Sequence, residues 1–333
     1  MPELRKDPIV NRWVVFSAER AERPTHYRIS HSPAPSDGAL YCPFCPEHEN
    51  ETPPEVFALP GGRAATADWQ LRVIPNRFPA LGVEGELQRS GDGLYDRLSG
   101  IGAHEVIIEH PSHSATLTTL SHGEIERVLY ACRERILDLK RDVRFRSIVV
   151  FKNWGAAAGA TISHSHSQLI ALPVVPKTIA EELEGTREHH ARTERCLFCD
   201  ILHQELHDRS RLIWENSQFV VLAPYAPRFP FETWILPRAH RSHFEEVGEP
   251  ELLPCAEALS QALLRLSRAL DQPPYNLVLH SAPFGEPRPH HYHWHIEIIP
   301  KLGHIAGFEW GSGFFINPTL PEAAARFLRE LDL

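Results

Sequence analysis

The chain has 333 residues, of which 42% are hydrophobic and 23% charged, a composition typical of a soluble globular protein with one large or two fused domains. Its 43 acidic and 34 basic residues give a formal net charge of −9, which argues against a protein that coats nucleic acid. Apolar runs fall short of the roughly 20 residues that span a bilayer, and the first residues lack the apolar segment of a signal peptide. We therefore expect a cytoplasmic protein without membrane or nucleic-acid partners.

Four of the six cysteines form two Cys-x-x-C pairs, and the first pair is Cys42 and Cys45. Without a secretion signal, such pairs favour metal binding or redox chemistry over a disulfide framework. Zinc prefers about four Cys and His ligands in a tetrahedron. His113, in "EHPSHS", and His164, in "TISHSHSQ", are candidates to complete the set. This pattern predicts a closed, structural zinc site, with a redox dithiol as the alternative.

A helix and two strands are predicted next along the chain. Residues 125–139 show apolar side chains at helical spacing, and Ser121 and Glu124 form a capping-box signature before them. The run "RSIVVFKN" (146–153) is typical of a β-strand. The segment "NWGAAAGAT" (153–161) is rich in small residues, which let backbone amides approach a phosphate closely.

The stretch "ATISHSHSQLIALP" (160–173) predicts a strand with His164, His166 and Gln168 on one face, because strand side chains repeat every two residues. If His164 binds a metal, His166 remains available as a nucleophile, since neutral imidazole can attack phosphorus. Gln168 would then hold a phosphoryl oxygen through its amide. A buried, hydrogen-bonded core histidine is the alternative for His166.

The second half repeats the first at an offset of 127 residues. This offset pairs His113 with His240 and His164 with His291, and it places a second helical pattern at 252–266. It also sets His295 against Gln168, so we expect the second half to be catalytically silent. The halves are interpreted as a duplication, with coincidence as the alternative. The second predicted zinc set is Cys196, Cys199, His240 and His291.

The order "SHSHSQ" resembles the His-x-His-x-Gln motif of the galactose-1-phosphate uridylyltransferase family within the histidine-triad superfamily. Further similar segments, including "CPFCPEHE", "VIPNRFPAL" and "HSAPFGEPRPHHYHWHIEIIP", extend the resemblance over nearly the whole chain. The resemblance implies an α/β (α+β) fold of two histidine-triad-like domains, each an antiparallel sheet with flanking helices. The polar segment 181–195 is the best boundary, so we place the domains at 1–185 and 186–333.

The resemblance also implies a reaction and a set of site residues. His166 would attack the α-phosphorus of UDP-glucose, release glucose 1-phosphate and carry UMP to galactose 1-phosphate in a ping-pong cycle. A homodimer with two structural zinc ions per chain is implied. The family's zinc ligands match Cys42, Cys45, His113 and His164. The residues expected around the nucleotide sugar are Arg20, Arg23, Asn76, Arg77, Phe78, Asn153, Gly159 and Thr161, with Phe308 and Glu309 at the hexose.

Other readings remain open. Ser165 and Ser167 replace the proline and glycine of the usual His-Pro-His-Gly-Gln motif, and the "HSHSQ" form with a second Cys-x-x-C also resembles plant-type relatives that phosphorolyse ADP-glucose. A histidine-triad hydrolase usually ends its motif in His, where this chain has Gln168. A zinc-stabilised binding module would leave His166 without a role.

Several polar residues are expected to serve no function. The histidines interpreted as solvated or otherwise satisfied are His48, His104, His110 and His122, and Arg28 and Lys152 are expected at the surface.

Overall fold

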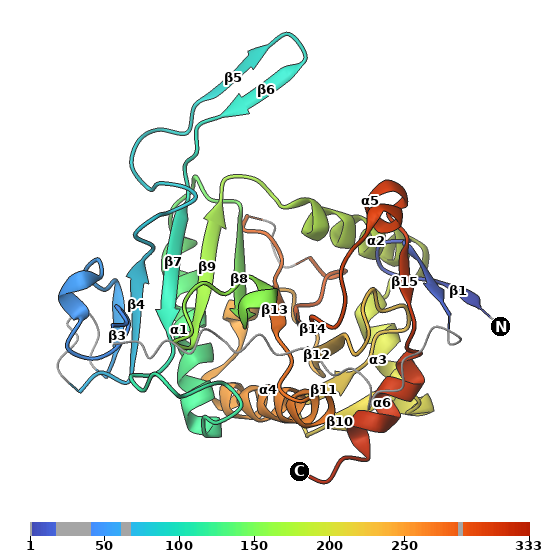
Figure 1. Cartoon of the computed structure of the whole chain (residues 1–333). Helices are drawn as coiled ribbons and strands as arrows, with labels where there is room; N and C mark the ends of the chain where they lie inside the picture. The colour runs from blue at the N-terminus through green and yellow to red at the C-terminus, as the bar shows by residue number, and fades with distance from the viewer. Residues whose placement is uncertain (1, 18–40, 61–67, 286–288) are drawn as a thin grey trace.

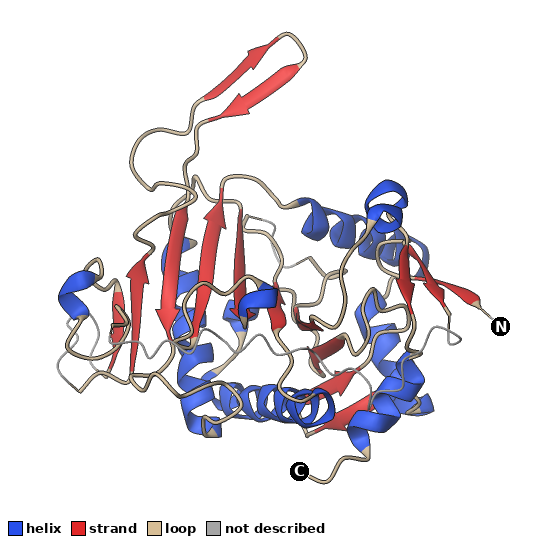
Figure 2. Cartoon of the chain, viewed as in Figure 1, coloured by secondary structure: helices blue, strands red, loops and turns tan. Residues whose placement is uncertain are grey.

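The structure is a computed structural model that describes residues 2–17, 41–60, 68–285 and 289–333. Its centre is a ten-stranded sheet in which all neighbouring strands run antiparallel (Figures 1 and 2). In spatial order the strands are β10 (Leu212–Glu215), β11 (Phe219–Leu222), β12 (Thr233–Pro237), β14 (His295–Pro300), β13 (Tyr275–His280), β8 (Ser147–Trp154), β9 (His166–Leu172), β7 (Ala103–Ile108), β4 (Leu71–Pro75) and β3 (Phe57–Leu59).

The sheet has the same arrangement when it is followed outward from its middle in either direction. β8 and β13 pair at the centre, with Phe151 opposite Val278. Gln168 lies beside Phe151 on β9, and Glu297 lies beside Val278 on β14. This register makes Glu297 the counterpart of Gln168, so the expected match of Gln168 with His295 is wrong by two residues.

The connection between the strands explains the two-residue error. It takes 15 residues from His280 to His295, but 13 from the equivalent Asn153 to His166. The two extra residues lie within this connection. The offset between the halves is therefore 127 before the connection and 129 after it. The symmetry of the sheet fits a duplication of one domain. The duplication and the domain boundary after residue 185 remain predictions.

Helices cover one face of the sheet and build the main core. α1 (His122–Leu139) begins with the predicted capping box of Ser121 and Glu124, and α4 (Glu249–Leu270) contains the predicted helical run of the second half. The two helices pack together and bury apolar side chains such as Ile125 and Leu259 against the sheet. Burial of this apolar area is the main stabilising contribution of the layer.

The opposite face carries different elements. α2 (Lys177–Thr193) packs Leu183 near Val149, and α3 (Leu197–Asp208) packs Phe198 against β11 and β12. A small sheet joins the two ends of the chain (Figure 1). It consists of β1 (Glu3–Lys6), β2 (Trp13–Phe16) and β15 (Phe315–Asn317), followed by α6 (Pro321–Arg329). The remaining short elements are α5 (Gly307–Ser312) and the 3-10 turns η3 (Glu49–Glu51), η4 (Ala156–Ala158) and η5 (Phe244–Glu246).

The segment 85–100 contains the hairpin β5 (Arg89–Asp92) and β6 (Tyr95–Leu98), which stands away from the body of the molecule (Figure 1). Asp92 pairs with Tyr95 across a two-residue turn, and Gly93 takes the positive φ of 59° that this turn needs. No helix among the described residues is long and apolar enough to cross a membrane.

A close approach between α2 and the N-terminal segment depends on Gly185. A Cβ at this position would lie 1.7 Å from the carbonyl oxygen of Ile9. We expect Gly185→Ala to lower the free energy of unfolding by about 1 to 3 kcal/mol, because the backbone must move to admit the methyl group. Urea denaturation measures the change. Gly123→Ala in α1 is the control, since its methyl group meets open space; an equal loss in both variants would contradict the explanation.

Candidate active site

The first predicted metal cluster is assembled on the sheet face that carries His166. Cys42 and Cys45 lie in one tight turn, in which the Cys45 N–H donates to Cys42 O, and Phe44 packs between this turn and the apolar side chains of β4 and β7. His164 Nδ1 lies 3.7 Å from Cys42 Sγ and 3.6 Å from Cys45 Sγ, and His113 Nδ1 lies 3.4 Å from Cys45 Sγ.

These separations suit zinc. Tetrahedral Zn–S and Zn–N bonds of about 2.3 and 2.0 Å imply S to N separations of about 3.5 Å. His164 Nε2–H donates to His110 O at 2.7 Å, and His113 Nε2 contacts Ser163 Oγ at 3.0 Å, so each ring directs Nδ1 towards the sulfurs. Burial lowers the pKa of His164 to about 4, which keeps the ring neutral and able to ligate. The four residues fit a closed zinc site, and a metal there would fix the Cys-x-x-C turn to β9.

The second cluster differs from the prediction by one ligand. Cys196, Cys199 and His240 come together as expected, but the fourth member is His293. Cys199 Sγ lies 3.4 Å from His240 Nδ1 and 3.6 Å from His293 Nδ1, while His293 Nε2–H donates to Pro237 O at 3.0 Å. His291 lies outside this cluster, with its ring 6.2 Å from the ring of His190. The cause is the longer connection before β14, which moves the ligand histidine two residues along the chain.

His166 begins β9 and has the geometry of a prepared nucleophile. The ring is 8% exposed, and its Nδ1–H donates to the backbone oxygen of His164 at 2.8 Å. Burial lowers the pKa of His166, and the nearby charge of Lys152 lowers it further, so the ring stays neutral near pH 7. With Nδ1 bonded to a carbonyl, Nε2 carries the lone pair. The residue can therefore attack an electrophile through Nε2.

Gln168 follows on the same face and is held by His104, a residue that we had expected to be a bystander. The Ala80 N–H donates to His104 Nδ1 at 3.2 Å, which favours the tautomer with the ring proton on Nε2, and the Asn76 amide nitrogen also lies 3.2 Å from Nε2. His104 Nε2 lies 2.8 Å from Gln168 Oε1 and donates to it. The Gln168 amide N–H groups then remain for a ligand. His104 lies on β7, diagonal to Gln168, and only the strand register brings the two residues together.

The loop between β8 and β9 contributes the small residues that we expected. Gly155 and Gly159 have φ values of 79° and 92°, which other residues rarely adopt. A Cβ at Gly159 would lie 3.7 Å from Asn153 Nδ2. Asn153 Oδ1 accepts from Asn276 Nδ2 at 2.8 Å, so its own amide N–H groups face the loop. Thr161 lies exposed at the end of this loop.

Asn76, Arg77 and Phe78 follow β4 beside His104. The Asn76 N–H donates to His104 O at 2.8 Å, and the Phe78 N–H donates to Asn76 Oδ1 at 2.8 Å. The Phe78 ring is 82% exposed, with the Arg77 guanidinium 5.9 Å from its centre. These residues offer an open aromatic surface and a positive charge beside His104, the partner of Gln168.

Phe308 and Glu309, which were predicted at the hexose, are not brought to His166. Phe308 and Glu309 lie on α5, which contacts β15 and lies apart from β9 in Figure 1. Glu309 accepts from the Ala306 N–H at 3.0 Å and caps this short helix. Arg20 and Arg23 lie outside the described residues.

Lys152 is buried, contrary to the expected surface position, and only 1% of its side chain is exposed. It pairs with Glu109 on the sheet face opposite to His166. Although burial opposes ionisation, Lys152 and two serine hydroxyls lower the pKa of Glu109. Burial also lowers the pKa of Lys152, and the Glu109 carboxylate at 2.8 Å opposes this effect, which explains how a lysine can lie in a strand interior.

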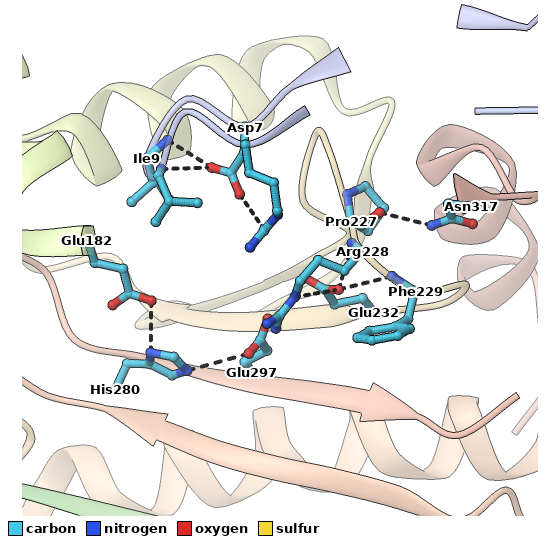
Figure 3. A network of polar contacts seen from close by, with 12 residues as sticks. Asp7, Ile9, Glu182, Pro227, Arg228, Phe229, Glu232, His280, Glu297 and Asn317 are labelled. Atoms are coloured by element: carbon cyan, nitrogen blue, oxygen red, sulfur yellow. Dashed lines mark hydrogen bonds and ion pairs between the residues drawn. The ribbon is translucent and has the colours of Figure 1, made fainter. Parts of the chain in front are cut away.

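The second half places a charged network where the first half has its nucleophile (Figure 3). The counterparts of Asn153, His166 and Gln168 are His280, His295 and Glu297. The His295 ring is buried and stacks on that of His280 at 4.5 Å.

His280 lies between two carboxylates in this network. Its Nδ1 is 3.0 Å from Glu182 and its Nε2 is 3.5 Å from Glu297. Against the effect of burial, the two carboxylates raise the pKa of His280 to about 10. Arg228 pairs with Glu297. Glu182, His280 and His295 are close enough to ligate a cation, but a protonated His280 and the Arg228 guanidinium already balance the carboxylates.

Comparison with known proteins places the chain in a family. The profile of the galactose-1-phosphate uridyl transferase N-terminal domain matches residues 1–176. The chain belongs to the galactose-1-phosphate uridylyltransferase family. A second profile, described as a domain of unknown function, matches residues 102–331. The predicted family is confirmed, and the chain is an enzyme of this group of nucleotidyltransferases and phosphorylases.

Individual relatives cover the whole chain. The ADP-glucose phosphorylase of Arabidopsis thaliana is 39% identical over 100% of this chain and 93% of its own length. The galactose-1-phosphate uridylyltransferase of Thermotoga maritima is 29% identical over 100% of this chain and 99% of its own length. A crystal structure of the Arabidopsis ADP-glucose phosphorylase with bound ADP-glucose covers 100% of both chains with a TM-score of 0.85 and 37% identity. A uridylyltransferase structure gives a TM-score of 0.77 at 28% identity, over 99% of this chain and 97% of its own.

The corrected ligand set predicts different effects for two neighbouring histidines. We expect His293→Ala to lower the metal content of the purified chain by about one zinc ion, because structural zinc needs four ligands. His291→Ala should keep the content of the unaltered protein. Mass spectrometry of the metal in both variants measures the difference, and the opposite pattern would restore the ligand set predicted from the sequence.

Proposed function

We propose that the chain transfers a nucleotidyl group from a nucleoside diphosphate sugar through His166, with ADP-glucose as donor and orthophosphate as acceptor. The observation that carries the proposal is the pair formed by His166 and Gln168. The hydrogen bond to His164 O leaves His166 Nε2 as the attacking atom, and Gln168 directs amide N–H groups to the same face. An attacking nitrogen beside neutral donors is the arrangement that nucleophilic transfer of a phosphoryl group needs.

The first half-reaction forms an adenylyl-histidine. His166 Nε2 attacks the α-phosphorus of ADP-glucose, the bond from that phosphorus to the bridging oxygen breaks, and glucose 1-phosphate leaves with the electron pair. The Nδ1–H proton stays on the ring, where the His164 carbonyl oxygen stabilises the positive charge that develops. The Gln168 amide donates to a phosphoryl oxygen as the geometry at phosphorus changes.

In the second half-reaction an orthophosphate oxygen attacks the same phosphorus. The bond from phosphorus to His166 Nε2 breaks, ADP forms, and the neutral ring is regenerated. Gln168 cannot act as a general acid or base, since an amide does not titrate near pH 7. Water is therefore not activated at this position, which favours transfer to an acceptor over the hydrolase alternative.

The proposal also covers the choice of donor, the metal and the oligomeric state. ADP-glucose is chosen because the phosphorylase of Arabidopsis is 39% identical over the whole chain. Zinc in the two Cys and His clusters would act as a structural cation, since four protein ligands leave no open position for water. We also propose a homodimer, in which Phe308 and Glu309 would serve the partner's site.

A second candidate is the transfer of UMP from UDP-glucose to galactose 1-phosphate. This is the reaction first expected from the sequence, and it keeps the same role for His166. The observation in its favour is the match of residues 1–176 to the uridyl transferase profile, together with the 29% identical uridylyltransferase of Thermotoga maritima.

Incubation of the chain with one nucleotide sugar at a time, without acceptor, distinguishes the candidates. We expect ADP-glucose to add one AMP to the intact chain, mapped to His166 by mass spectrometry, and expect the adduct to disappear when orthophosphate is added. His166→Gly should keep its metal and lose the adduct. A UMP adduct alone, formed from UDP-glucose, would favour the second candidate, and no adduct with either donor would refute transfer through His166.

Removal of His104 should weaken the transfer step. In His104→Ala the Gln168 amide loses the donor that fixes its orientation, so we expect adduct formation to slow by about tenfold, equivalent to about 1.4 kcal/mol. The double variant with Gln168→Ala should be little slower than Gln168→Ala alone, because the two residues act as a unit. Rapid-quench kinetics measure the rates. His122→Ala is the control, since His122 is exposed at the start of α1; additive losses would show that His104 acts independently.

A further inference from the structure

Four polar side chains lie buried beneath β9, on the face opposite to the His166 ring. Lys152 Nζ donates to Glu109 Oε2 at 2.8 Å and to Ser165 Oγ at 3.0 Å. Ser165 and Ser167 each donate a hydroxyl to Glu109, at 2.5 and 2.6 Å. This buried tetrad consists of Glu109, Lys152, Ser165 and Ser167.

The tetrad holds the backbone on both sides of the nucleophile. Lys152 Nζ also donates to the carbonyl oxygen of His166 at 3.0 Å, and the Glu109 N–H donates to the carbonyl oxygen of Ser165 at 3.2 Å. The His166 ring itself is bonded to His164 O. The tetrad therefore fixes the backbone from which the His166 ring projects. Its side chains lie on the core face of β9, away from the face where a substrate would bind.

The second half shows that this fold does not need such a tetrad. Its five strands follow the same order as those of the first half, and α4 packs on them as α1 packs on the first half. Val106 lies opposite Gln168 in the pair β7 and β9, and Trp234 lies opposite Glu297 in the pair β12 and β14, so β12 is the counterpart of β7 and β14 is the counterpart of β9. The equivalent positions are all apolar: Pro237 for Glu109, Leu279 for Lys152, Trp294 for Ser165 and Ile296 for Ser167.

Burial of an ion pair is unfavourable compared with apolar packing at the same place. The desolvation of two charges commonly equals or exceeds their mutual attraction, so an apolar replacement is often neutral or stabilising. A polar set that appears only under the strand with the nucleophile therefore has a purpose other than stability. Buried polar groups fix one geometry strongly, because each misplaced donor or acceptor remains unsatisfied.

We propose that Glu109, Lys152, Ser165 and Ser167 are positioning residues that hold His166 in line for attack on the nucleotide sugar. The inference rests on the proposed function, since it assigns a role in the same transfer step. The tetrad touches neither substrate nor reacting atoms. It acts through the β9 backbone, and small errors of position at a nucleophile have large effects on rate.

The test replaces the whole tetrad by apolar residues, as in the second half. In Glu109→Leu, Lys152→Leu, Ser165→Ala and Ser167→Ala combined, no charge or hydroxyl of the set remains buried without a partner. We expect the variant to keep its zinc content and thermal midpoint, and to form the His166 adduct from ADP-glucose about 10 to 100 times more slowly. The ADP-glucose concentration at half-maximal rate should change less than twofold, because the substrate contacts are unchanged.

A second buried ion pair provides the matched control. Arg135 donates to both oxygens of Glu105 at 2.8 Å, and this pair lies on the same face of β7 without being part of the tetrad. Glu105→Leu combined with Arg135→Met should leave the rate of adduct formation unaltered.

Each outcome decides the inference. A tetrad variant that is folded and reacts at the unaltered rate would overturn it, and so would one that unfolds or loses zinc, because the tetrad would then belong to the fold. An equal loss in the control variant would show a general effect of buried charge. Failure of the unaltered chain to form any adduct would instead refute the proposed function, so the two failures are distinct.

Discussion

The alternation of side chains along β9 is the constraint on which the site depends. Even-numbered residues from His164 to Gln168 face the metal cluster and the open face, while Ser165 and Ser167 face the core. The strand and the two residues before it therefore carry a metal ligand, a nucleophile and an amide on one side, and their support on the other. A shift of one residue in the pairing with β7 or β8 would exchange these faces and abolish both functions.

The two halves of the sheet use one framework for different purposes. In the first half the His166 face is bordered by small or neutral residues, so an anionic ligand can approach. In the second half Glu297 replaces the amide, and Arg228 and His280 neutralise it from both sides. Glu297 is already bonded to these two cations and has no N–H to donate to a phosphate, and His295 is 2% exposed against 8% for His166. Both halves keep a Cys and His cluster, which fits a role for these clusters in the fold.

Much of this could be predicted from the sequence, because its signals are local. Capping at Ser121, helical periodicity and the ligand types around Cys42 depend on residues close together in the chain or on strong ligand preferences. The errors involve information that spacing alone does not contain. His291 was chosen by a constant offset that an insertion breaks, and Lys152 and His104 acquire their roles from neighbours on other strands. Strand register brings such partners together, and no short motif records it.

The junction of the two chain ends has a consequence for biosynthesis. β2 near the start pairs in parallel with β15 near the end, with Val14 opposite Phe315. About 300 residues separate these partners, so β2 lacks its second neighbour until β15 has left the ribosome. The first half can build its own strands earlier, but the small sheet closes only after β15 has been made. Chains truncated before β15 should therefore expose an unpaired strand edge, which quality control in the cell can recognise.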